Sequence, residues 1–215
     1  MDVAVAGGHG KIALRLLRML AERGDGARGL IRNIEHGPDL ERVGATPVGA
    51  DLENLDADAI ARSIAGCDAV VFAAGAGPGS GAARKRTMDY GGAVKLIEAC
   101  RMNDIHRYVM VSAIGAGHPE RSSGQMRPYV EAKADADREL AGSGLDYTIV
   151  RPGRLTDDDG TGLIEAAPEL GHGGEIPRDD VAATLLACLD EPGTIGKTFE
   201  LVSGETPIAE ALRAL

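Results

Sequence analysis

The stretch Val3-Ala4-Val5-Ala6-Gly7-Gly8-His9-Gly10-Lys11-Ile12-Ala13 decides the fold, because an apolar run of strand length passes through three glycines into a helical pattern. Apolar residues then recur at helical spacing as far as Leu20. A strand, a glycine-rich turn and a helix in this order leave free N–H groups at the start of the helix, where an anion such as a phosphate is stabilised.

The same alternation of strand and helix continues along the chain. Further strands are expected at 29–31, within 44–50, and at 69–73, 108–111, 147–150 and 199–201, and further helices at 12–20, 55–64, 88–102, 128–142 and 179–189. Strands that are apolar on both faces and separated by helices predict a parallel sheet covered on each side. We therefore predict an α/β fold: a Rossmann-like, doubly wound parallel sheet flanked by helices, in a single domain over residues 1–215 with a small C-terminal extension.

Composition argues against several classes of partner. The net charge of −10 repels phosphate backbones and anionic lipid, and with four Tyr, two Phe and no Trp a base-stacking surface is not expected. The start Met1-Asp2-Val3 lacks the basic residues of a secretory signal, so a cytoplasmic location is expected. The three separated cysteines predict buried free thiols, and the scattered histidines predict no metal site.

The glycine turn has the features of a dinucleotide site. The first glycine, Gly7 or Gly8, permits a tight turn, Gly10 lets a diphosphate approach the backbone, and the small Ala13 stands where a third glycine is usual. Contacts to the cofactor are predicted from Gly7, Gly8, His9, Gly10, Lys11 and Ile12.

The end of the second strand indicates which dinucleotide binds. Leu30-Ile31-Arg32-Asn33 contains no Asp or Glu to hold ribose hydroxyls, whereas Arg32 offers a guanidinium to a 2′-phosphate. NADP is thus favoured over NAD, with Arg32 and Asn33 beside the ribose. The alternative is that Arg32 is only a solvated charge, and Lys11 is equally compatible with either role.

Later strand ends fit the same ligand. Asp51 and Leu52 either contact the adenine or, in the case of Asp51, cap a helix. Ala73, Ala74 and Gly75 carry no bulky side chain and leave room for a ribose. The glycine-rich segment 75–81 is expected to form a mobile loop at the mouth of the crevice.

A tyrosine and a lysine lie one helical turn apart in Tyr129-Val130-Glu131-Ala132-Lys133. A phenol is a weak proton donor at neutral pH, and a neighbouring ammonium favours its ionised form. Tyr129 is therefore a candidate general acid, Lys133 its partner and an anchor for the nicotinamide ribose, and Ser112 a hydroxyl that orients the substrate. The alternative is an ordinary amphipathic helix face.

The chain resembles an atypical short-chain dehydrogenase/reductase of the NAD(P)-binding, NmrA-like and flavin/biliverdin-reductase-like group over nearly its whole length. The matching segments are residues 7–13, 30–33, 50–52, 111–113, 129–133, 145–153 and 178–182. The resemblance implies that Pro152 and Gly153 lie beside the nicotinamide, and Val111 is also expected to contact the cofactor. It also implies a substrate pocket contributed mainly by residues 112–130 and 152–180. The short stretch after Pro152 disfavours a sugar-nucleotide substrate.

Two functions follow as hypotheses. The first is an NADP(H)-dependent oxidoreductase that transfers hydride to a small carbonyl, quinone-like or flavin-like acceptor. The second is a non-catalytic NADP(H)-binding redox sensor that acts through a protein partner. A small-molecule acceptor is expected for the enzyme, with His118, Arg121 and Arg127 favouring an anionic one, and a homodimer is left open.

Overall fold

The computed structural model describes residues 1–77 and 79–215, so that Pro78, in the expected loop 75–81, lies outside the described residues. Its strands are β1 Asp2–Ala6, β2 Gly26–Ile31, β3 Thr46–Gly49, β4 Ala69–Phe72, β5 Arg107–Val111, β6 Asp146–Pro152, β7 Arg154–Thr156, β8 Leu163–Ala167, β9 Glu175–Pro177, β10 Lys197–Ser203 and β11 Thr206–Pro207. Its α-helices are α1 Lys11–Arg23, α2 Gly37–Glu41, α3 Ala57–Ile64, α4 Ala82–Lys85, α5 Ala93–Met102, α6 Arg127–Ala141, α7 Arg178–Asp190 and α8 Ile208–Arg213.

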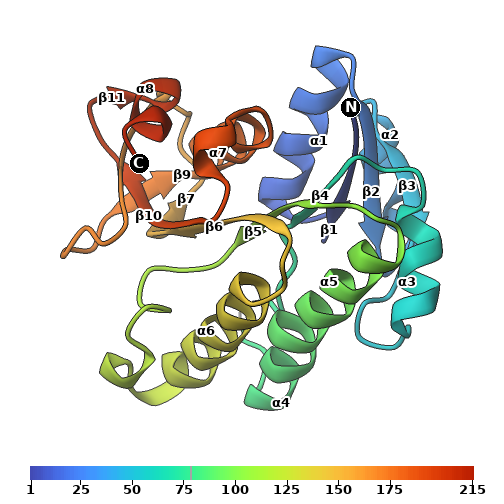
Figure 1. Cartoon of the computed structure of the whole chain (residues 1–215), viewed down its shortest axis with the longest axis horizontal. Helices are drawn as coiled ribbons and strands as arrows, with labels where there is room; N and C mark the ends of the chain where they lie inside the picture. The colour runs from blue at the N-terminus through green and yellow to red at the C-terminus, as the bar shows by residue number, and fades with distance from the viewer. Residues whose placement is uncertain (78) are drawn as a thin grey trace.

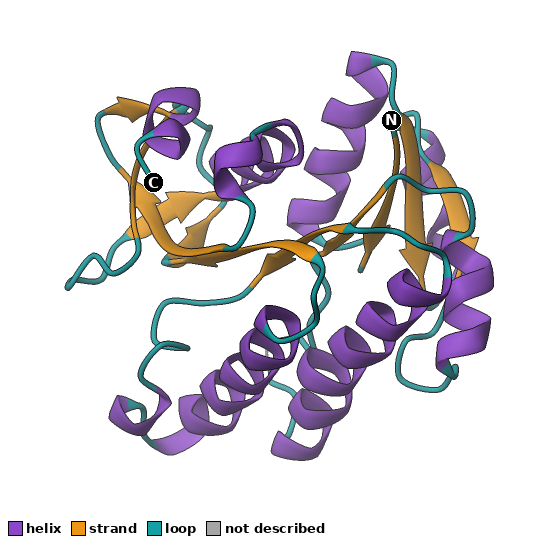
Figure 2. Cartoon of the chain, in the orientation of Figure 1, coloured by secondary structure: helices purple, strands orange, loops and turns teal. Residues whose placement is uncertain are grey.

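The central sheet confirms the predicted α/β, Rossmann-like fold. Its strand order is β11-β8-β10-β6-β5-β4-β1-β2-β3. Within this order, every neighbouring pair from β10 to β3 is parallel. Figure 1 shows α1 and α7 on one side of the sheet and α5 and α6 on the other, and Figure 2 shows the sheet enclosed between these helical layers. The chain reverses direction of winding beside β1, and ligands of such sheets bind at this point.

Burial on both sides of β1 explains its apolar sequence. Val3 and Val5 pack into the core beneath α1 and α7, whereas Ala4 and Ala6 pack into the core beneath α3 and α5. Successive side chains of a strand point to opposite faces, so a strand between two helical layers is apolar throughout.

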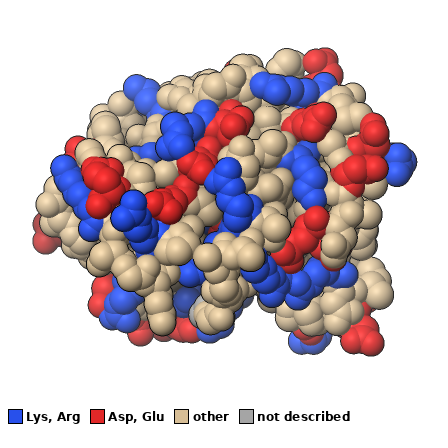
Figure 3. Space-filling model, turned by 90° about the horizontal axis from the view of Figure 1, so that it is seen from below, with Lys and Arg blue, Asp and Glu red and all other residues tan. Residues whose placement is uncertain are grey.

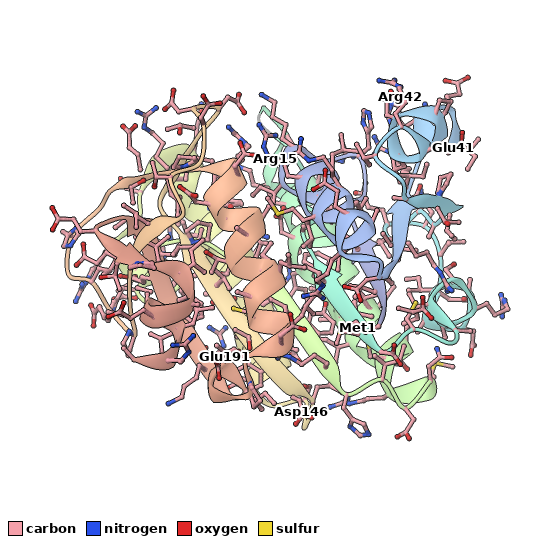
Figure 4. All side chains as sticks on the ribbon, turned by 90° about the horizontal axis from the view of Figure 1, so that it is seen from above. Met1, Arg15, Glu41, Arg42, Asp146 and Glu191 are labelled. Carbon is pink, nitrogen blue, oxygen red and sulfur yellow. The ribbon has the colours of Figure 1, made fainter. Side chains whose placement is uncertain are left out.

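Helix α1 forms from a single apolar stripe. Ile12, Leu16, Leu17 and Leu20 are buried on one face, and Gly24 ends the helix in the left-handed conformation with φ of 87°. On the same side of the sheet, α7 lies next to α1, as the view from above also shows (Figure 4).

The C-terminal extension departs from the expected all-parallel pattern. Strand β8 pairs antiparallel with β10, and β11 pairs antiparallel with β8. In β8 the buried Ile164 stands between the exposed Leu163 and Glu165, and an antiparallel edge of this kind tolerates one face in water. The extension is thus an antiparallel border on the sheet, with β7 and β9 as a separate two-stranded pair beside it.

Helix α6 lies on the side of the sheet opposite to α1 and α7 and carries several ion pairs at its surface. Asp135 pairs with Arg86 and Arg138, and Glu131 pairs with Arg127. Figure 3, seen from below, shows positive and negative side chains intermixed over this face. In the described part of the chain, none of the helices combines the length and the apolar character needed to cross a bilayer.

Candidate functional site

The turn between β1 and α1 has no room for side chains. Gly7 has a φ of +79°, and a Cβ atom built on it would lie 2.7 Å from the Cα of Ala74. The N–H of Gly10 donates to the carbonyl of Gly7 at 2.7 Å, and α1 then begins without a side-chain cap and without an acidic residue in its first turn. Uncapped amides at the positive end of a helix dipole suit a diphosphate, so the turn fits a dinucleotide.

A cavity of about 290 Å³ adjoins this turn. The carboxyl ends of β1, β2, β3 and β4 lie along this cavity, because the strand register places them side by side. The predicted cofactor residues that line it are Gly7, His9, Gly10, Arg32, Asn33, Asp51, Leu52, Ala73, Ala74 and Gly75. Its remaining walls are Leu30, Ile31, His36, Ala50, Glu53, Arg84 and Met88.

Four of these wall residues, namely His36, Glu53, Arg84 and Met88, were missed by the sequence analysis. Arg84 and Met88 stand four residues apart beyond the glycine-rich segment, which is a helical spacing. No local pattern connects them with β2, and only the folded sheet brings them opposite Arg32.

Other predicted cofactor residues lie outside this cavity. Gly8 is buried behind the turn against Gly29, and Ile12 belongs to the core. The ammonium of Lys11 pairs with Asp157 at 2.5 Å. The same carboxylate accepts a hydrogen bond from Arg178 at 2.8 Å, which ties the start of α1 to the segment 152–180.

The loop after β3 is stabilised by its own side chains. Asp51 accepts hydrogen bonds from the N–H of Glu53 at 3.0 Å and from the side-chain amide of Asn54 at 2.8 Å. Burial opposes ionisation of Asp51, but these hydrogen bonds and the charge of Arg32 lower its pKa below the usual value. The cap of α3 is Asp56 instead, so Asp51 lines the cavity without capping a helix.

Two histidines stack at the edge of the cavity. The rings of His9 and His36 lie 3.8 Å apart between centroids and 19° from parallel. His9 Nε2 is 2.6 Å from Asp39, and this hydrogen bond, with the charge of Arg42, lowers the pKa of that carboxyl. The stack and the contact with Asp39 connect His9 of the glycine turn with the segment after β2.

The tyrosine and lysine lie on α6 as predicted, with Pro128 in its first turn. Tyr129 is half-buried, whereas the side chain of Lys133 is 5% exposed. The ammonium of Lys133 donates to the carbonyl of Val111 at 3.1 Å and lies 6.0 Å from the centre of the Tyr129 ring. The helix face therefore meets the carboxyl end of β5, at the same edge of the sheet as the glycine turn.

Lys133 also has a buried counter-ion that the sequence analysis missed. The carboxylate of Asp89 is 3.3 Å from the ammonium, and the Asp89 side chain is 1% exposed. Its second oxygen accepts the N–H of Ala76 at 3.1 Å. Asp89 thus connects the loop after β4, which lines the cavity, with the lysine of α6. It lies within a π-helical segment, Arg86–Gly92, and such segments are frequent at functional sites.

Ser112 lies in a second buried polar group. Its hydroxyl is buried and is close to Asp137, which pairs with Arg151 at 2.9 Å. Burial raises the pKa of Asp137, while Arg151, Ser112 and Lys133 act in the opposite direction. Tyr129, Lys133 and Asp137 follow one another at intervals of four residues. The tyrosine and the two buried charged side chains therefore lie on the same face of α6.

The two segments predicted to form the substrate pocket lie against each other. His118 is 3.2 Å from Glu169, which joins the segment 112–130 to the segment 152–180. Near the latter, at the carboxyl ends of β7 and β10, a cavity of about 400 Å³ is lined in part by Thr156, Asp158, Glu165, His172 and Glu175. Gly153 packs directly against Gly174: a Cβ atom built on Gly153 would lie 2.3 Å from the carbonyl oxygen of Gly174. Pro152 is buried at the end of β6 and accepts the N–H of Ile114 through its carbonyl.

His118, Arg121 and Arg127 of the segment 114–127 have carboxylates beside them. His118 and Arg121 both approach Glu169, and Arg127 pairs with Glu131 at 2.7 Å. An anionic acceptor stays a prediction, because ion pairs between exposed side chains leave these groups accessible to another anion.

Comparison with known proteins gives a consistent result. Residues 7–192 match the model of a family described as NAD(P)H-binding. The chain is 43% identical to a Bacillus subtilis protein named uncharacterized sugar epimerase YhfK, with all of both chains covered. It is 41% identical to the solved structure of a candidate NAD-dependent epimerase/dehydratase from Bacillus halodurans, with a TM-score of 0.94 and all of both chains covered.

A third relative is the oxidoreductase ylbE from Lactococcus lactis, whose structure is 29% identical with a TM-score of 0.88 and covers 100% of this chain and 96% of that one. These findings confirm the resemblance to the NAD(P)-binding proteins of the short-chain dehydrogenase/reductase type at the level of family and fold. The chain belongs to the family of NAD(P)H-binding proteins, and it shares its Rossmann fold with the Bacillus halodurans protein and with the oxidoreductase ylbE.

Proposed function

We propose that this protein is an NADP(H)-dependent oxidoreductase that reduces a small carbonyl, quinone-like or flavin-like acceptor. One observation carries the proposal. Lys133 of the Tyr129–Lys133 pair bonds to Val111 at the end of β5, so the pair stands at the edge of the sheet where the glycine turn opens. A nicotinamide supplies the hydride when it is bound. The residues of the chain contribute binding, orientation and a proton.

Binding is the role of the turn and the cavity. The uncapped amides of α1 suit the diphosphate, and the small residues Ala73, Ala74 and Gly75 leave space along the carboxyl end of β4. Arg32 and Arg84 provide guanidinium groups at the far end of the cavity.

Tyr129 is proposed as the general acid that donates a proton to the acceptor. When a carbonyl accepts a hydride, negative charge develops on its oxygen, and a nearby hydroxyl that donates its proton lowers the barrier. The ammonium of Lys133, 6.0 Å from the ring centre, stabilises the negative charge left on the phenol oxygen.

Lys133 retains a donor for the ribose. An ammonium has three N–H groups, and in this structure Val111 and Asp89 are its two polar neighbours among the described residues. The third N–H is available to a ribose hydroxyl. Ser112 as the orienting hydroxyl stays a prediction, because its oxygen is buried beside Asp137 in this conformation.

Replacement of the phenol hydroxyl tests the proposal. A Tyr129→Phe variant is expected to keep its affinity for NADPH and to lose about 10²- to 10⁴-fold in turnover on carbonyl acceptors, the usual contribution of a general acid. Consumption of NADPH would be followed with a panel of aldehydes, quinones and flavins. Tyr147→Phe, on β6, is the matched control.

Two outcomes would contradict parts of the proposal. Unchanged carbonyl turnover in Tyr129→Phe would remove the tyrosine from the mechanism. Tight NADPH binding by the unaltered protein, with no consumption across the panel, would favour a non-catalytic binding function.

A further inference from the structure

The carboxylate of Glu53 is held by three side chains from two parts of the chain. One oxygen lies 3.2 Å from both Nε and Nη2 of Arg84 and 3.5 Å from Nη1 of Arg32. The other accepts the hydroxyl of Thr87 at 2.8 Å. The Glu53 side chain is 17% exposed and lies in the wall of the 290 Å³ cavity.

The donors come from opposite walls. Arg32 follows β2, whereas Arg84 belongs to α4 beyond the glycine-rich segment. The backbone between them is fixed, because the ammonium of Lys95 donates to the carbonyl of Glu53 at 3.0 Å and to that of Leu55 at 2.8 Å. The two guanidinium groups converge on one oxygen of Glu53 inside the cavity. Because the backbone is fixed, another anion could replace the Glu53 carboxylate through movements of side chains alone.

Two guanidinium groups and a hydroxyl are also the donors that recognise a phosphate. The acidic and basic side chains of the cavity balance, with Asp51 and Glu53 against Arg32 and Arg84. Asp51 is occupied by its own turn, so Glu53 is the carboxylate that competes for the arginines. Arg32 and Arg84 are half-exposed, so water screens their ion pairs with Glu53, and these pairs exchange more readily than fully buried ones.

We propose that Arg32, Arg84 and Thr87 form the subsite for the 2′-phosphate of NADP, and that Glu53 competes with this phosphate for them and so sets the preference between NADP and NAD. This inference rests on the proposed use of NADP(H), and it adds Arg84, Thr87 and Glu53 to the residues that determine specificity. An anion that enters the subsite displaces the Glu53 carboxylate toward solvent. A coenzyme without the 2′-phosphate leaves the Glu53 pairs intact.

The test uses fragments that isolate this end of the coenzyme. Adenosine 2′,5′-bisphosphate and 5′-AMP would be titrated by calorimetry into the full-length protein and into Arg84→Met and Glu53→Gln variants, followed by NADP⁺ and NAD⁺. Arg86→Met is the matched control, since Arg86 lies two residues beyond Arg84 and has the same charge and length, but pairs with Asp135 and stacks on Tyr90. Melting temperatures would establish that each variant is folded.

Opposite effects are expected from the two variants. Arg84→Met should weaken the bisphosphate about tenfold or more and leave 5′-AMP unchanged, because a charge-assisted hydrogen-bond pair is lost. Glu53→Gln should strengthen the bisphosphate and NADP⁺ by about three- to tenfold, because the competing charge is removed while the side chain keeps its shape. Arg86→Met should match the unaltered protein.

Three results would overturn the inference. Weaker 5′-AMP and NAD⁺ binding in Glu53→Gln, without a gain for the bisphosphate, would assign Glu53 to the ribose hydroxyls of NAD and leave the oxidoreductase proposal intact. Equal losses for both fragments in Arg84→Met would limit Arg84 to a contact with adenine. Failure of the unaltered protein to bind any of the four ligands would overturn the proposed function as well.

Discussion

The buried pair of Lys133 and Asp89 allows a quantitative test of the site. Lys133→Met removes the ammonium but keeps the length of the side chain, so that the carboxylate of Asp89 stays buried without a counter-ion. Breaking a buried ion pair in this way costs about 3–5 kcal/mol. At about 2–4 °C per kcal/mol for a chain of this size, the melting temperature should fall by roughly 6–20 °C.

Neutralising both partners should restore much of the loss. In Asp89→Asn/Lys133→Met neither side chain of this pair carries a charge, and the amide oxygen introduced at position 89 can still accept the N–H of Ala76. The double variant is therefore expected to be more stable than Lys133→Met alone. Thermal unfolding followed by circular dichroism near pH 7.5 measures both, and Lys197→Met, at an exposed position of β10, should change the free energy of unfolding by no more than about 0.5 kcal/mol.

Additive losses of unfolding free energy in the Lys133 and Asp89 variants would contradict the proposed coupling of the pair. A double variant that is destabilised by the sum of the two single effects would mean that Lys133 and Asp89 are not coupled in the folded protein. A Lys133→Met variant as stable as the Lys197→Met control would show that the Asp89 charge is compensated elsewhere.

Two further predictions concern titration. Burial raises the pKa of the Cys100 thiol and of the Cys188 thiol to about 12, so at pH 8 only roughly 10⁻⁴ of each is thiolate, and a thiol reagent should label them only after unfolding; fast labelling of the native protein would contradict this. The pKa of Asp51 is lowered, so its ionised form stabilises the fold above the unfolded value near 4 and this stabilisation is lost as the pH falls through the folded value. Asp51→Ala should accordingly be less stable than the unaltered protein at pH 6, and chemical denaturation should find that the difference shrinks between pH 5 and pH 3; a constant difference would rule out this linkage.

Features that depend on neighbouring residues were predicted well. The glycines of the first turn, the strand before it and the stripe of α1 lie within one short stretch, and each has a local cause in backbone conformation or periodicity. The three cysteines are free and buried, as expected. The spacing of Tyr129 and Lys133 placed both correctly on one helix.

The same reasoning could not find the partners of these residues. Asp89 precedes Lys133 by more than forty positions, and nothing in its own surroundings distinguishes it from a surface acid. Glu53 was passed over for the same reason, and the sequence did not indicate that Glu169 and Glu131 lie beside His118 and Arg127.

The sequence by itself determined the layered α/β architecture and the position of the glycine turn, because strand and helix periodicity and the conformational freedom of Gly7 are properties of short segments. The tertiary structure alone decided which charges meet: Lys133 with Asp89, and Arg32 and Arg84 with Glu53. The reason is physical. Charge pairing depends on distances across the sheet edge and on burial, and both are set only when the strand ends come together.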